Sequence, residues 1–177
     1  MLAYEPINVA IASSMNTIDA LTKNLKLVDK AIEKNVRGLN EVEYTILNSI
    51  PGIDPVFAAG IISEIGSAKF FPDNNALAKY AGLTWRKTQS GNYEVDTTRM
   101  TKTGNRYLRY YLIEAISHVK QEIPEYQDFY AKKYNEVSKT QHKRALALTA
   151  RKFVRLVFGL LHHNQLYIKD KGVNLTE

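Results

Sequence analysis

Apolar residues recur at intervals of three or four positions from residue 7 to residue 46, and charged residues such as Lys23, Lys30 and Glu33 lie between them. The apolar positions are Ile7, Ile11, Met15, Ile18, Leu21, Leu25, Val28, Ile32, Val36, Leu39, Val42 and Ile46. A mean spacing of about 3.5 residues is typical of a coiled-coil helix. No proline interrupts residues 7–50, so the pattern predicts one helix of about 40 residues, roughly 60 Å long.

A helix of this length extends beyond what a small domain can cover, so its apolar stripe needs a partner. The partner is either the same helix from a second chain or another part of this chain. The regular heptad spacing favours self-association. We therefore expect residues 1–48 to form an oligomerisation helix that makes a homodimer or a higher oligomer.

Shorter helices follow Pro51. Asp54 and Asp73 are suitable N-cap residues, and Pro55 is a suitable first helical residue. The predicted helices cover residues 55–65, 75–81 and 105–121, a stretch after Pro124, and residues 141–163.

Residues 83–100 have a different composition. They include Trp85, which is the only tryptophan, and the turn-forming sequence Ser90-Gly91-Asn92. The segment is predicted to be a loop or a short hairpin. Together the patterns predict a mainly α fold: a coiled-coil helix at residues 1–48, a compact helical domain at 49–167 and a flexible tail at 168–177.

The composition excludes several classes of protein. The chain has 177 residues, of which 45% are hydrophobic, and it has no cysteine. It therefore has no disulfide framework, thiol nucleophile or thiolate zinc site. No apolar run approaches the ~18 residues that a membrane helix needs, and the first residues do not resemble a signal peptide. We expect a cytoplasmic protein without membrane association.

Positive charge is concentrated in the second half of the chain. Residues 1–85 contain 7 Lys or Arg against 9 Asp or Glu, whereas residues 86–177 contain 17 against 9. This asymmetry indicates either a surface that binds a polyanion or a solubilising basic surface. Charge alone does not decide between them.

The sequence Ile50-Pro51-Gly52-Ile53-Asp54 resembles the turn of a helix-hairpin-helix motif. In that motif a glycine turn directs backbone N–H groups at a DNA phosphate, which makes Gly52 a candidate DNA contact. Asp54 stands where a second glycine is usual, and its carboxylate would repel a phosphate. A capped corner between two helices explains the same residues.

Ser90 lies beside Gly91 and shortly after Arg86 and Lys87. Serine next to glycine usually forms a turn. A loop serine among cations can also attack a DNA phosphodiester, because arginine neutralises the charge that develops on the phosphorus oxygens. Ser90 is therefore a candidate nucleophile, with Arg86 and Lys87 as candidate DNA contacts.

A second basic cluster surrounds the predicted start of the helix at residue 105. Lys102, Arg106 and Arg109 are spaced four and three residues apart and share one helical face, with Arg99 and Asn105 nearby. They could hold phosphates, or they could form a solvated basic face. No set of carboxylates is spaced as in a two-metal nuclease, so no metal ligand is predicted in this chain.

Several short motifs occur together in one order and spacing. They are Ile50-Pro51-Gly52-Ile53-Asp54, Ala59-x-x-x-x-Glu64-Ile65-Gly66, Phe71-Pro72, Leu77-x-x-Tyr80-Ala81-Gly82-Leu83, Gln89-Ser90-Gly91, Thr101-Lys102-x-Gly104-Asn105-x-x-Leu108-Arg109 and Ala150-Arg151-Lys152. In this order they resemble the carboxy-terminal transposase domain of the IS-one-ten-type insertion-sequence transposases, which are RNA-guided (bridge-RNA) recombinases. The resemblance covers about residues 45–167, and the preceding helix resembles the coiled-coil linker of that family.

The resemblance implies a catalytic serine at Ser90 that links covalently to DNA. It also implies that longer family members carry an amino-terminal RuvC-like domain, which holds the divalent metal, and that they work as multimers with a guide RNA. No cofactor is expected in this chain itself. Trp85 departs from the family pattern, because proline is common there, and Glu94 and Asp96 are acidic where the family is usually basic.

These observations predict a DNA transposase or recombinase domain that cleaves and rejoins strands through a serine nucleophile, acting in a prokaryotic cytoplasm near the nucleoid. Arg86, Arg99, Lys102, Arg106 and Arg109 would hold phosphates, and Asn105 would orient an oxygen. Without a RuvC-like domain and guide RNA, the chain should bind DNA but cut it poorly. The alternatives are a non-catalytic dimeric nucleic-acid-binding module and a structural oligomerisation protein.

Overall fold

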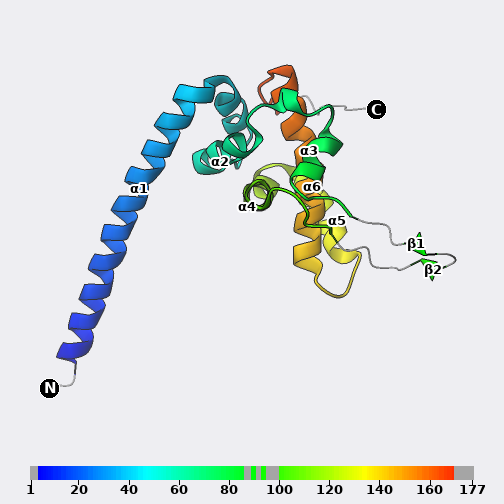
Figure 1. Ribbon diagram of the computed structural model, residues 1–177. Coiled ribbons are helices and arrows are strands. Elements are labelled where there is room, and N and C mark those ends of the chain that lie inside the picture. The colour runs from blue at the N-terminus through cyan, green and yellow to red at the C-terminus, as the bar shows by residue number, and fades with distance from the viewer. Residues whose placement is uncertain (1–3, 86–88, 91–92, 95–99, 170–177) are drawn as a thin grey trace.

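The computed structural model describes residues 4–85, 89–90, 93–94 and 100–169. Within these ranges the chain is mainly helical, as the sequence predicted (Figure 1). The elements are α1 (Glu5–Asn48), α2 (Pro55–Ile65), the 3-10 helix η1 (Ala68–Phe70), α3 (Asn74–Tyr80), β1 (Gln89–Ser90), β2 (Tyr93–Glu94), α4 (Arg106–Glu122), α5 (Pro124–Asn135) and α6 (Gln141–His163). No helix in the described part of the chain is both long and apolar enough to cross a membrane.

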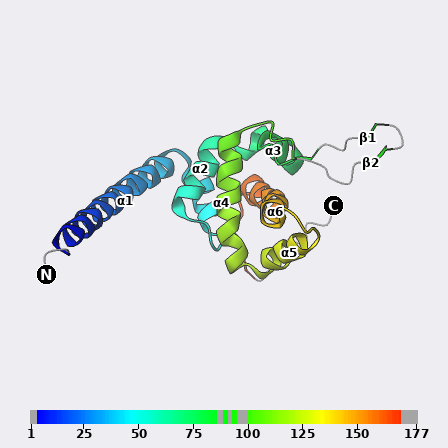
Figure 2. The same cartoon turned by 90° about the horizontal axis from the view of Figure 1, so that it is seen from below.

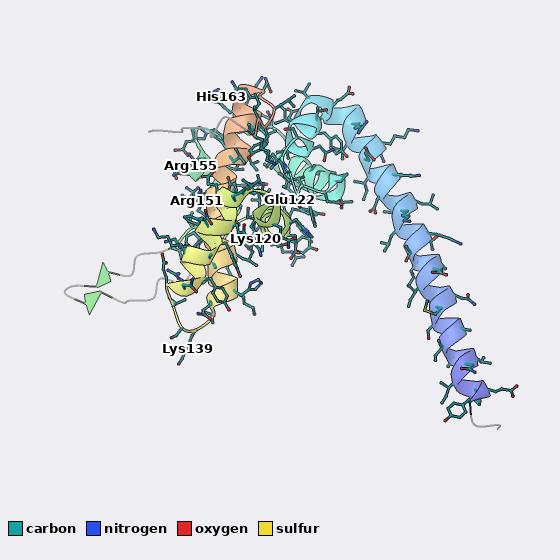
Figure 3. All side chains as sticks on the ribbon, turned by 180° about the vertical axis from the view of Figure 1, so that it is seen from behind. Lys120, Glu122, Lys139, Arg151, Arg155 and His163 are labelled. Carbon is teal, nitrogen blue, oxygen red and sulfur yellow. The ribbon has the colours of Figure 1, made fainter. Side chains whose placement is uncertain are left out.

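Helix α1 projects from the body of the molecule, and the side chains of its first part point into solvent on all sides (Figures 1 and 3). Its apolar stripe is uncovered there, with Ile7, Ile18 and Leu25 between 54% and 62% exposed. The stripe therefore has no partner within the described chain over this length.

The prediction of an unbroken helix over residues 7–50 is wrong at Asn40, whose backbone angles (φ −144°, ψ 59°) are not helical. Gly38 and Asn40 both have low helix propensity, and the break lets the last turns of α1 join the domain. Tyr44 and Leu47 are almost completely buried. The structural core thus begins before residue 48, inside the predicted oligomerisation helix.

Helix α6 forms the centre of the helical body. It contacts α1, α3, α4, α5 and η1, and Figure 2 shows it end-on with α3, α4 and α5 around it. Its buried residues include Ala150, Phe153, Val154 and Val157. Helix α2 packs between α1 and α4, which fixes the start of α4 relative to the rest of the body.

The predicted N-caps are confirmed. Asp54 accepts a hydrogen bond from the Val56 backbone N–H at 2.8 Å and caps α2. Asp73 accepts one from the Ala76 N–H at 2.6 Å and caps α3. The sequence therefore located both helix starts to within one residue.

The predicted short hairpin is also present. Strands β1 and β2 pair antiparallel, with Gln89 opposite Glu94 and Ser90 opposite Tyr93. At the base of the segment, Trp85 forms a β-bridge with Met100. The strands lie beyond the helical body, on the side of α3 (Figures 1 and 2).

Candidate nucleic-acid interface

The structure gathers part of the predicted site at the start of α4. Lys102, Asn105, Arg106 and Arg109 lie on the loop before this helix and on its first turn. Ser90 ends β1. Arg86, Lys87 and Arg99 lie outside the described residues, so their roles stay predictions.

The side chain of Asn105 is fully occupied by contacts within the protein. Its Oδ1 accepts hydrogen bonds from the backbone N–H groups of Tyr107 (2.9 Å) and Leu108 (3.0 Å), which caps α4. Its Nδ2 donates to Glu64 Oε2 at 2.6 Å and to the Tyr80 hydroxyl at 3.2 Å. An amide has two donor hydrogens and one acceptor oxygen, so a phosphate contact would require one of these bonds to break.

Arg109 holds the loop before α4. Its Nη1 donates to the carbonyl oxygen of Ala81 at 3.1 Å and to that of Lys102 at 3.2 Å. The Asn105 backbone N–H also donates to the Tyr80 carbonyl oxygen at 2.6 Å. Arg109 thus ties Lys102 to the end of α3, and its predicted contact with a phosphate stays a prediction.

Arg106 and Lys102 are the exposed cations of the cluster. Arg106 Nη2 donates to the Tyr107 hydroxyl at 2.6 Å, and the guanidinium lies 4.7 Å from the centre of the Tyr107 ring. The hydrogen bond to Tyr107 raises the pKa of Arg106 above its ordinary value. Lys102 has a left-handed backbone (φ 53°), which is rare for a residue other than glycine. Because both side chains are exposed, both cations can reach a ligand in solvent.

Gly52 lies away from this cluster, at the turn between α1 and α2. Its φ is +86°, and a Cβ there would come within 2.9 Å of the Val119 backbone in α4. Val119 is about 20 Å along α4 from Arg106. Close packing on α4 accounts for Gly52 without any DNA contact, so the predicted phosphate contact stays a prediction.

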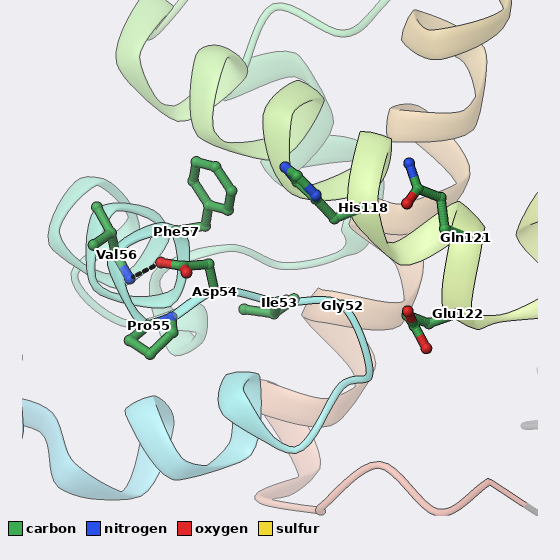
Figure 4. Close-up of a pocket in the computed structure, with 9 residues that line it drawn as sticks. All are labelled: Gly52, Ile53, Asp54, Pro55, Val56, Phe57, His118, Gln121 and Glu122. Carbon is green, nitrogen blue, oxygen red and sulfur yellow. Dashed lines mark hydrogen bonds between the residues drawn. The ribbon is translucent and has the colours of Figure 1, made fainter. Parts of the chain in front are cut away.

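A shallow hollow of about 600 Å³ opens beside this turn (Figure 4). Residues 52–57 line one side, and His118, Gln121 and Glu122 of α4 line the other. The rings of Phe57 and His118 stack with their centres 5.7 Å apart. The carboxylates of Asp54 and Glu122 make the hollow unfavourable for phosphate.

Arg151 of α6, labelled in Figure 3, belongs to a motif that the sequence left without a role. It joins α6 to the start of α3. Its guanidinium donates to Asn74 Oδ1 at 3.3 Å and also to Asn75 Oδ1. Burial lowers the pKa of Arg151, and the nearby Arg155 lowers it further. Arg151 therefore has a structural role in holding α3.

Sequence reasoning missed the roles of Glu64 and Tyr80. Both occur in motifs quoted above, but their bonds to Asn105 join residues 41 and 25 positions apart. No local spacing predicts such a contact.

Among the described residues, no group of three or more His, Asp or Glu side chains could hold a metal ion. The resemblance places the divalent metal in a RuvC-like domain, and its expected absence from this chain stays a prediction. No step of the chemistry proposed below passes through a metal.

Residues 44–131 match the model of the Transposase IS116/IS110/IS902 family. These residues belong to that family. The matched region begins at the first buried residues of the last turns of α1 and includes Ser90 and all of α2, α3 and α4. The resemblance found from the sequence motifs is therefore confirmed.

Two insertion-element proteins are similar to the chain. An uncharacterised protein of insertion element IS116 from Streptomyces clavuligerus is 28% identical over 161 residues, which is 88% of this chain and 40% of the relative. An uncharacterised protein of insertion element IS110 from Streptomyces coelicolor is 26% identical over 140 residues, 78% of this chain and 34% of the relative. The chain thus spans less than half the length of these relatives.

Proposed function

We propose that this chain supplies the serine-nucleophile domain of a DNA transposase, which cleaves and rejoins strands when an insertion sequence moves. The main support is the family match, because it encloses both the Ser90 hairpin and the cationic start of α4. Both similar proteins come from bacterial insertion elements. We expect the protein to act on DNA in a prokaryotic cytoplasm, in association with the nucleoid.

The proposed chemistry is a transesterification at one DNA phosphodiester. The Ser90 Oγ attacks phosphorus as a general base takes its proton, and the bond from phosphorus to one deoxyribose oxygen breaks. That oxygen takes up a proton and leaves as a hydroxyl, while the protein keeps a phosphoserine ester. A second deoxyribose hydroxyl then attacks this ester and releases Ser90, so the strand is rejoined without an external energy source.

Exposed cations would stabilise the charge on the phosphate oxygens during both steps. Lys102 and Arg106 are suited to this because both are exposed and both follow the hairpin-bearing segment closely in the chain. Arg86, Lys87 and Arg99 would add contacts around Ser90. Arg109 would act by holding the backbone of Lys102 in place.

We further propose that strand transfer needs more than the residues of this chain. The relatives are more than twice as long as the region they share with it. We infer that a RuvC-like domain and a guide RNA complete the enzyme, and that two or more copies associate through the exposed stripe of α1.

Covalent trapping of the protein on DNA tests the proposal. The chain would be incubated with duplex DNA that carries the junction of the element, with and without a RuvC-like domain and guide RNA. With the RuvC-like domain and guide RNA present, we expect an adduct that survives denaturant with wild type, none with Ser90→Ala, and an undiminished adduct with Ser138→Ala, the matched control at an exposed serine before α6.

An adduct that persists in Ser90→Ala would overturn the assignment of the nucleophile. If no condition gives an adduct but DNA binding persists and weakens with salt, the chain is the non-catalytic binding module instead. Such binding would be carried by the exposed cations at the start of α4.

A further inference from the structure

One face of α4 carries an aromatic side chain in almost every turn. The four residues are Tyr107, Tyr110, Tyr111 and His118. The last three follow Tyr107 by three, four and eleven positions, which places all four on one side of the helix. Tyr107 is 53% exposed and Tyr110 is 55% exposed. The rings of Tyr110 and Tyr111 meet edge to face, with centres 5.4 Å apart. We call these four residues with Phe57 the aromatic strip.

Residues of helix α2 pack against the strip. Tyr111 packs so closely on Gly60 that a Cβ there would come within 2.5 Å of the ring. One turn earlier in α2, Phe57 stacks on His118 at the far end of the strip (Figure 4). From Tyr107 to His118 the strip is about 16 Å long, roughly the rise of five stacked nucleotides.

The charge along the strip changes from one end to the other. Arg106 lies against Tyr107, Lys102 lies on the loop before α4, and the ion pairs of the described residues include neither cation. Glu114 lies part-way along the same face of α4, and Asp54 and Glu122 lie at the far end. A polyanion backbone would therefore be attracted at the start of α4 and repelled beyond the middle of the strip.

We infer that the aromatic strip binds unpaired bases of single-stranded DNA, which rests on the proposed function. Exposed tyrosine rings beside arginine are the usual means of holding single strands, since each base can stack on a ring while cations hold the phosphates. The proposed rejoining moves a cleaved strand to a new partner, which requires bases of that strand to be unpaired. Duplex DNA gains no stacking energy from the rings, because its bases are already stacked on one another. The positive charge of Arg106 at the Tyr107 ring favours this occupant over a second protein chain.

Fluorescence anisotropy of the full chain with labelled oligothymidylate and with a labelled duplex of equal length tests the inference. We expect the double variant Tyr107→Leu/Tyr110→Leu to bind the single strand roughly 5- to 100-fold more weakly and the duplex almost unchanged. Tyr107→Phe/Tyr110→Phe should retain binding of the single strand, since phenylalanine keeps the ring. Tyr134→Leu, at a partly exposed tyrosine of α5, is the matched control and should bind both DNAs as wild type does.

The quenching of 2-aminopurine placed within the single strand reports stacking directly, and we expect it to be lost in the double leucine variant. Equal weakening of the binding of both DNAs, unchanged binding of the single strand, or a changed oligomeric state in sedimentation would overturn the inference.

A second variant, Lys102→Ala/Arg106→Ala, should weaken the binding of both DNAs. If duplex binding requires these cations while the tyrosine variants have no effect, the inference fails and the proposed function stands. If wild type binds neither DNA, both fail.

Discussion

Gly104 occupies a position that only glycine can hold. Its φ is +132°, and a Cβ there would collide with the Tyr80 carbonyl oxygen and come within 3.0 Å of the Gly82 nitrogen. All of these neighbours are backbone atoms, which cannot move aside as a flexible side chain can. The loop of Lys102 and the cap of α4 are thus placed by a close approach of two backbones.

Gly104→Ala should lower the free energy of unfolding by about 2–4 kcal/mol, since it adds both backbone strain and overpacking. Urea denaturation followed by circular dichroism measures this. Gly38→Ala is the matched control, because nothing lies within 4 Å of a Cβ at Gly38 and alanine is the better helix former. It should raise stability by roughly 0.5–1 kcal/mol. Similar losses from both variants would show that the contact with Tyr80 does not matter.

At the scale of single residues, the sequence predicted which cations share a face but not what each one does. Lys102, Arg106 and Arg109 come together because helical spacing decides it. The separate tasks of Arg109 and Asn105 depend on carbonyls and side chains supplied by α2 and α3. Such partners are brought close only by folding, and one sequence contains no local signal for them.

Helix α4 depends on Asn105 at its first turn. The Asn105 side chain caps two backbone N–H groups and also satisfies Glu64. Asn105→Ala should therefore lower the free energy of unfolding by about 1–2 kcal/mol. Asn105→Ser, which can still cap the helix, should recover part of this loss. The measurement is again urea denaturation, now paired with DNA binding at the same temperature.

The two readouts separate a cap from a phosphate contact. For a cap, stability falls in Asn105→Ala, and at a temperature where the variant is fully folded its DNA affinity remains close to that of wild type. Unchanged stability with a large loss of DNA affinity would instead support the predicted contact between Asn105 and a phosphate.

At the scale of elements, helix starts were predictable because a cap is a local event. Asp54 and Asp73 bond to N–H groups two and three residues away, so the sequence alone identifies them. The break of α1 at Asn40 was not predictable from periodicity, because the apolar spacing continues through it. The last turns of α1 leave the line of the helix to bury Tyr44 and Leu47 against α2 and α6, and this tertiary packing overrides the local pattern.

At the scale of the whole molecule, one chain contains two regions that bury their apolar residues differently. The helical body covers its core with α1 to α6, whereas the first part of α1 leaves an apolar stripe about 54% or more exposed. A stripe with coiled-coil spacing is expected to pair with another copy. The body should fold without this pairing, since Val36 is the one buried core residue of the described chain that lies before the break at Asn40.

Charge placed on the stripe should therefore dissociate the oligomer and leave the body folded. Ile18→Asp/Leu25→Asp lowers the net charge by two, as does the control Lys23→Gln/Lys30→Gln on the opposite side of α1. Sedimentation at micromolar concentration should show wild type and the control as a dimer or larger species, and the aspartate variant as a monomer, because two carboxylates on each copy would be buried without partners. The urea transition of the helical body should remain in the aspartate variant. A monomeric wild type, or equal dissociation of the control, would mean that the stripe has another partner.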